Sequence, residues 1–241
     1  MLVRAYLPKF ITALFGGLFI ATGILTFGNA MVFDRLFIGV LIFTAIVCRS
    51  NINVVGIIAI LAVERVLEEL LWFSVIDQFY NIWQIKVVIY AGLMWILYKL
   101  WYDLMVKIAL PFILLSVAAE FYWYFIDYEL VPGIYWYNII IGLNLVTRYL
   151  LFSRIELTES LTSKSAESVN LDWVIYQITR LYIVIEILNI SEYLLRHTVE
   201  YFNIQLVYSS YPYLLHSIST FTLWVVFNET NKLIKSRLVS A

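Results

Sequence analysis

Cysteine, histidine and charged residues are scarce in this chain of 241 residues, and each scarcity excludes a class of site. One cysteine, Cys48, excludes an intrachain disulfide and a CxxC metal or redox motif. Two histidines, His197 and His216, leave too few ligands for a zinc or haem centre, so we expect no metal and no cofactor. Charged residues make up 14% of the chain and the net charge is -1, so no nucleic-acid partner is expected.

Helix-breaking residues and catalytic motifs are also rare. Only Pro111 and Pro212 of the four prolines fall inside the apolar runs described below, so the broken helices of many secondary transporters are not predicted. The GxSxG, HExxH, GxGxxG and P-loop motifs are absent from the sequence. We therefore do not expect an enzyme.

Hydrophobic residues, in contrast, make up 63% of the chain and occur in runs of about 20, the length that a helix needs to cross a bilayer. These runs lack the alternation of barrel strands. The sequence predicts an all-α fold: a polytopic transmembrane bundle of about eight helices arranged as four helical hairpins, in a single integral membrane domain over 1–241. The expected spans are 10–30, 32–48, 53–75, 81–98, 106–126, 134–152, 172–194 and 205–227.

The hairpins resemble one another in one detail. Glu69-Leu-Leu-Trp72-Phe73 in the third span is echoed 51 residues later by Glu120-Phe-Tyr-Trp123-Tyr124. The echo fits either a repeated hairpin or the simple periodicity of helices that run outward, and the sequence leaves both open.

Lysine and arginine predict the orientation, because cytoplasmic connections of membrane proteins are enriched in them. With eight spans, eleven cations share one side: Arg4, Lys9, Arg49, Lys99, Lys107, Arg148, Arg154, Lys164, Lys232, Lys235 and Arg237. The other connections contain acids with few cations: Asp34, Asp77, Asp127, Glu129 and Glu200, beside Arg35 and Arg196. We expect a multi-pass protein of the cell inner membrane, in contact with the lipid bilayer, with both termini cytoplasmic.

The longest polar segment, residues 154–170, is expected to be a cytoplasmic loop. Its Ser, Thr and Glu residues are typical of a solvated linker, and a docking site for a cytosolic partner is the alternative. In the first span, Ala13, Gly17 and Ala21 have the four-residue spacing of small side chains that lets helices pack closely. The neighbour is either a helix of the same chain or another subunit, in a homo-oligomer or a membrane complex.

Carboxylates occur at membrane depth in three helices. The third span contains Glu64, Glu68 and Glu69, and Arg65 can pair with Glu68 or Glu69 at helical spacing. Lys86 in the next span reaches a depth comparable to that of Glu69. Charges are costly in the hydrocarbon core, so these side chains are expected to face protein or water.

The fifth and seventh spans each carry a polar and aromatic stripe. One stripe contains Ser116, Glu120, Trp123, Tyr124 and Asp127, and the other contains Tyr182, Glu186, Asn189 and Tyr193. Three helices thus each bring a carboxylate to one face, which is how a proton or cation pathway is built. The alternative is interhelical hydrogen bonding that serves packing alone.

Two functions follow from these patterns. The first is a channel- or transporter-like component for ions or protons that uses Glu64, Glu68, Glu69, Glu120 and Glu186. The second is a non-transporting membrane subunit that anchors or senses for a cytosolic partner complex, for instance in envelope signalling or phage defence. The unpaired carboxylates favour the first function, and the scarcity of helix breaks favours the second.

Overall fold

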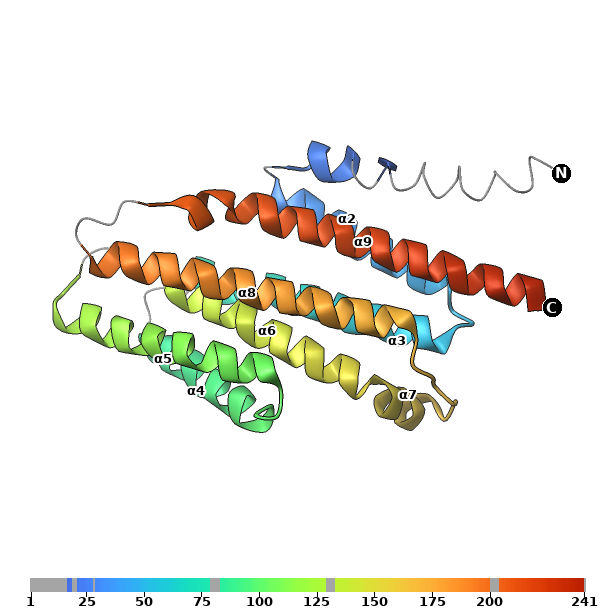
Figure 1. The fold of residues 1–241 in the computed structure, drawn as a ribbon, viewed down its shortest axis with the longest axis horizontal. Coiled ribbons are helices and arrows are strands. Elements are labelled where there is room, and N and C mark those ends of the chain that lie inside the picture. Colours follow the sequence, from blue (N-terminus) through green and yellow to red (C-terminus); the bar gives the residue numbers. More distant parts are fainter. Residues whose placement is uncertain are drawn as a thin grey trace. The chain divides into compact units, whose positions relative to one another are not determined.

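The computed structural model describes residues 17–18, 21–27, 29–78, 83–128, 133–199 and 204–240, the side chains of 30, 31, 76–78 and 233–240 excepted. All regular elements in these ranges are helices (Figure 1), which confirms the all-α prediction. They are α2 (Ala30–Val47), α3 (Ile52–Leu71), the π-helix η1 (Trp72–Gln78), α4 (Trp83–Lys99), α5 (Leu104–Phe125), α6 (Ile134–Phe152), α7 (Arg154–Thr162), α8 (Asn170–Thr198) and α9 (Leu206–Ser240).

The helices follow the expected spans closely from the second span onward. α6 has the bounds of the expected span 134–152, whereas α9 continues to Ser240, well past the apolar run that was expected to end at 227. Helix formation requires only backbone hydrogen bonds and tolerates polar side chains, so a helix can outlast its apolar segment. The first expected span, 10–30, lies mostly outside the described residues.

The expected loop 154–170 begins with a helix. α7 occupies Arg154–Thr162, and its Arg154 and Thr158 are buried one turn apart. Their burial gives this short polar segment a packed face that its sequence pattern did not reveal.

Among the described helices, α5 and α8 are long and apolar enough to cross a membrane, with mean hydropathies of 2.0 and 1.3. About a third of the apolar segment of α5 and less than half of that of α8 is buried within the protein. Length and composition thus give weak support for membrane association, and the eight-span arrangement remains a prediction.

Contacts divide the chain into two compact units. Unit 1 consists of residues 1–62, 154–175 and 213–241, and unit 2 consists of residues 63–153 and 176–212. Three of the four unit boundaries fall within α3, α8 and α9, so each of these helices contributes residues to both units, and the fourth lies between α6 and α7.

Helix α6 is the centre of unit 2. Both α4 and α5 pack against it (Figure 1), and Ile183, Ile187 and Ile190 of α8 join the same apolar core. Gly142 permits the close approach of α4, because a Cβ there would lie 2.5 Å from Cδ2 of Leu93. Gly142 therefore marks a close contact between α4 and α6.

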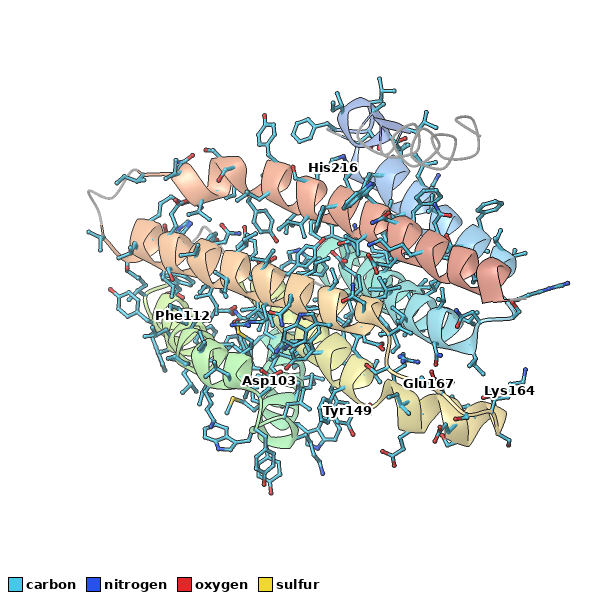
Figure 2. All side chains as sticks on the ribbon, turned by 45° about the vertical axis from the view of Figure 1, so that its right-hand side comes forward. Asp103, Phe112, Tyr149, Lys164, Glu167 and His216 are labelled. Atoms are coloured by element: carbon cyan, nitrogen blue, oxygen red, sulfur yellow. The ribbon has the colours of Figure 1, made fainter. Side chains whose placement is uncertain are left out.

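In unit 1, α9 packs against the segment before α2 through His216, which is labelled in Figure 2. The His216 imidazole contacts the Gly23 carbonyl, and its ring lies 4.1 Å from that of Phe33. A Cβ at Gly23 would lie 2.7 Å from Oγ1 of Thr220, so this contact also requires a glycine. Gly23 is thus a point of close approach in unit 1.

The small-residue stripe of the first span precedes this contact in the sequence. Ala13 is outside the described residues, and Gly17 and Ala21 are exposed. A Cβ at Gly17 would meet nothing within 4 Å among the residues that the structure describes. The predicted contact of this stripe stays a prediction.

Candidate functional site

Glu186 of α8 is the most enclosed carboxylate that the structure describes, with 0% of its surface exposed. The Tyr211 hydroxyl donates a hydrogen bond to its Oε1. Its Oε2 receives no hydrogen bond from the described residues. One oxygen of this carboxyl group is therefore anchored, and the other is available to exchange a proton or to bind a donor.

Side chains from four helices surround Glu186. Glu68 of α3 lies near enough for its charge to interact with that of Glu186, and Arg65 donates a hydrogen bond to Glu68. The Tyr137 ring of α6 lies 5.8 Å from the Tyr211 ring. We call this group the Glu186 cluster, and its members are Arg65, Glu68, Tyr137, Glu186, Asn189 and Tyr211.

Asn189 and Tyr193 continue the polar face of α8. The buried Asn189 lies against the Tyr137 hydroxyl, and the Tyr193 ring lies 5.9 Å from the Tyr137 ring. The stripe predicted for the seventh span thus faces the interior of unit 2 at Glu186, Asn189 and Tyr193. The partners of this stripe on α6 and α9 were not evident from the sequence, because tyrosine also occurs throughout the chain as an interfacial residue.

Glu120 of α5 belongs to a second polar group, made with two residues of α4. Its Oε1 accepts a hydrogen bond of 2.9 Å from the Tyr90 hydroxyl, and its Oε2 lies 3.2 Å from Nζ of Lys86. Lys86 is buried and also lies over the ring of Tyr135. The sequence predicts a depth for Lys86 comparable to that of Glu69, whereas in the structure Lys86 forms an ion pair with Glu120.

The remaining acids of α3 lie in different surroundings. Glu64 is half-buried and faces the Thr147 side chain of α6, whereas Glu69 is exposed. Consecutive positions on a helix point about 100° apart, so Glu68 and Glu69 cannot share one environment. Of the three acids on α3, only Glu68 enters the Glu186 cluster.

Only three residues of the stripe predicted on the fifth span are buried, namely Ser116, Glu120 and Trp123. The Ser116 hydroxyl is satisfied within α5, by donating to the Phe112 carbonyl at 2.8 Å. Tyr124 and Asp127 are exposed. Asp127 has a positive φ of 49°, and the amide of the next residue bonds back to the Trp123 carbonyl, which is the usual way for a helix to end. Asp127 therefore terminates α5 and does not continue its polar face.

Glu192, one turn beyond Asn189 on α8, has a structural role. Its carboxylate accepts the backbone N–H groups of Val207 and Tyr208, at 2.7 and 2.9 Å. These amides lie in the first turn of α9 and have no partner within the helix, so Glu192 caps α9 from α8.

Sequence reasoning missed a buried ion pair in unit 2. Arg148 of α6 is 3% exposed and donates Nε to Oδ2 of Asp103 at 2.8 Å and Nη2 to Oδ1 at 3.1 Å. Its Nη1 donates to the Tyr176 carbonyl, and its guanidinium lies 3.8 Å from the centre of the Tyr176 ring. Figure 2 labels Asp103, which also caps α5 by accepting the Met105 amide.

The pKa of Asp103 is lowered by this pairing. Partial burial by itself would raise the pKa, but the hydrogen bonds from Arg148 and the Met105 amide, with the Arg148 charge, outweigh that effect. Asp103 is thus held as a carboxylate at neutral pH.

A second missed arginine organises unit 1. Arg154 is 1% exposed, and its Nε and Nη2 donate to the two Asp172 oxygens at 2.6 and 2.7 Å. It also donates to the Glu167 carbonyl at 2.6 Å and to Asn53 at 3.3 Å. The start of α7, the segment before α8 and the start of α3 are thereby joined. The sequence predicts both arginines only as cytoplasmic cations. Their ion pairs were not predicted, because Asp103 and Asp172 are distant from them in the sequence.

Within the described part of the chain, no three His, Cys, Asp or Glu side chains gather in a group that could hold a metal ion. Comparisons with protein-family models, with curated proteins and with solved structures found no match for this chain. Its function is therefore inferred from its own residues.

Proposed function

We propose that this protein is a multi-pass inner-membrane protein whose Glu186 cluster transfers protons, as a channel- or transporter-like component. The observation that carries the proposal is the Glu186 carboxyl group, which is fully buried, anchored at Oε1 by Tyr211 and without a hydrogen bond from the described residues at Oε2. Ionisable groups inside membrane segments are costly and mark ion or proton pathways.

The surroundings of Glu186 supply partners for proton transfer. The charge of Glu68 interacts with that of Glu186, the Tyr211 hydroxyl donates to Oε1 of Glu186, and the Tyr137 ring lies 5.8 Å from the Tyr211 ring. A carboxyl group releases and accepts a proton, and a phenol relays a proton by giving up its own as it accepts another. Glu186 can therefore exchange a proton with Glu68, or through the Tyr211 hydroxyl, and return to its starting state. Arg65 holds Glu68 in position by its hydrogen bond.

Glu120 is assigned a packing role in this proposal. Both of its oxygens lie against α4, one on the Tyr90 hydroxyl and one on the Lys86 ammonium group. A buried carboxylate with a cation beside it is compensated in place. It therefore provides a matched control for Glu186, because both are buried glutamates on apolar helices.

Proton flux into liposomes tests the proposal. Wild-type protein is reconstituted with a pH-sensitive dye inside the vesicles, and a potassium diffusion potential with valinomycin drives proton entry. We expect flux from the wild type, none from Glu186→Gln, reduced flux from Tyr211→Phe and wild-type flux from Lys86→Met/Glu120→Gln, which removes both charges of the buried pair. A wild-type protein that moves no protons at any pH or voltage would contradict the proposal, as would a Glu186→Gln variant with full flux.

The eight-span topology is part of the proposal and has its own test. It is supported by helices at seven of the expected spans and by the distribution of Lys and Arg. Reporter fusions at the C-terminus and near Asp127 are expected to lie on opposite sides of the membrane, with the C-terminus in the cytoplasm. A periplasmic C-terminus would show the topology to be wrong.

The second candidate function is a non-transporting subunit that anchors a cytosolic partner, and one feature of α7 favours it. Leu157 and Leu161 are exposed one turn apart on this mostly polar helix, and Leu161 is 82% exposed. Exposed apolar residues at this spacing are typical of a helix that docks on a partner. This candidate predicts a stoichiometric cytosolic partner that is lost in Leu157→Ser/Leu161→Ser, together with vesicles that stay tight to protons.

A further inference from the structure

The turn between α4 and α5 exposes several large aromatic side chains. Tyr102 is 96% exposed and Trp101 is about half exposed, and Trp95 and Tyr98 at the end of α4 are also largely exposed. They lie where two apolar helices end, which is where tyrosine and tryptophan occur at membrane interfaces. Each of these side chains is amphipathic, because its aromatic ring is apolar and its hydroxyl or indole N–H group is polar.

Two lysines flank the aromatic residues. Lys99 ends α4 and Lys107 lies in the first turn of α5, and both are exposed. The Lys99 ammonium group lies 5.9 Å from the centre of the Trp95 ring. We call residues 95–107 the basic aromatic turn.

The only acid in this segment does not offset the two lysines at the surface. Asp103 directs both of its carboxylate oxygens to the guanidinium of Arg148, which is buried on α6. Its charge is therefore compensated internally, and Lys99 and Lys107 are left to set the charge of the exposed surface. The same pair fixes the turn to α6, so the exposed residues are held on a rigid base.

We propose that the basic aromatic turn binds the headgroups of anionic phospholipids. Lys99 and Lys107 bind the phosphate groups, and Trp101 and Tyr102 lie in the headgroup layer. The two exposed lysines favour a partner with negative charge. The exposed tyrosine and tryptophan rings favour a partner at a membrane interface, where polar headgroups meet the hydrocarbon core. The proposal uses the membrane placement given under Proposed function but is independent of proton transfer.

Spin-labelled lipids test this binding. The protein is reconstituted in phosphatidylcholine with a small amount of either spin-labelled phosphatidylglycerol or spin-labelled phosphatidylcholine, and electron paramagnetic resonance measures the motionally restricted fraction of each. We expect the wild type to prefer phosphatidylglycerol. In Lys99→Gln/Lys107→Gln we expect this preference to fall by at least about fivefold, since each lysine near an anionic surface contributes to binding.

The matched control is Arg49→Gln/Lys164→Gln, which removes the same charge from two exposed residues of other cytoplasmic connections. It is expected to keep the preference, and thermal unfolding of each variant verifies the fold. Equal restriction of both lipids by the wild type, or an unchanged preference in the Lys99 and Lys107 variant, would overturn the proposal. Glu186→Gln is expected to keep the lipid preference while it loses flux, so failure of one proposal is distinguishable from failure of the other.

Discussion

Arg148 and Asp103 are 45 residues apart in the sequence and form a two-point pair, with Nε and Nη2 of the arginine on the two carboxylate oxygens. The planar guanidinium matches a carboxylate in this geometry, and its remaining nitrogen donates to the Tyr176 carbonyl. One buried arginine thereby joins α6, the start of α5 and α8.

Loss of the Asp103 carboxylate is expected to destabilise the protein. Asp103→Asn leaves the Arg148 charge buried with an incomplete set of acceptors, and breaking such a pair costs on the order of 3 kcal/mol. Thermal unfolding in detergent measures the change. Lys107→Gln, an exposed change in the same region, is expected to leave the melting temperature unchanged, and equal stability of the two variants would contradict the prediction.

The same pair predicts a dependence of stability on pH. Because the pKa of Asp103 is lowered in the folded state, the pair stabilises the protein above the unfolded pKa of about 3.9. This stabilisation is lost as the pH falls through the lower folded pKa. The difference in melting temperature between wild type and Asp103→Asn is therefore expected to shrink between pH 5 and pH 3, and a constant difference would show that the carboxylate charge is not responsible.

Lys86 and Glu120 are expected to be energetically coupled. Each single change, Lys86→Met or Glu120→Gln, leaves a buried charge without its partner, so the double variant should be more stable than the sum of the single effects predicts. A double-mutant cycle based on free energies of unfolding measures the coupling. Effects that add to within about 0.5 kcal/mol would mean that the two groups do not depend on each other.

Gly142 is expected to tolerate no larger side chain. In Gly142→Ala the new methyl group would meet Leu93 at 2.5 Å, so α4 and α6 must separate or Leu93 must move, at a cost of about 1–3 kcal/mol. Gly92→Ala is the control, because a Cβ there meets nothing within 4 Å among the described residues. The control should be neutral or slightly stabilising, since alanine favours helix more than glycine does. Similar melting temperatures for the two variants would argue against close packing at Gly142.

The sequence by itself determined the helical class and the approximate bounds of most helices. When lipid or a dry protein core surrounds a long apolar run without alternation, its backbone groups must form their hydrogen bonds within a helix. The formation of these helices therefore follows from local composition. The sequence could also predict that Arg65 pairs with Glu68 or Glu69, because residues three or four apart on a helix are neighbours. The structure contains the Arg65–Glu68 pair.

Only the tertiary structure decided which charged groups meet. The pairings of Lys86 with Glu120, Arg148 with Asp103 and Arg154 with Asp172 join residues from different helices, or from either side of a loop, and helical spacing predicts none of them. Tertiary packing also separated acids that look equivalent in the sequence: Glu186 is enclosed with one oxygen unbonded by the described residues, whereas Glu192 caps α9. A side chain's surroundings depend on the rotation of each helix and on its neighbours, which periodicity leaves undetermined.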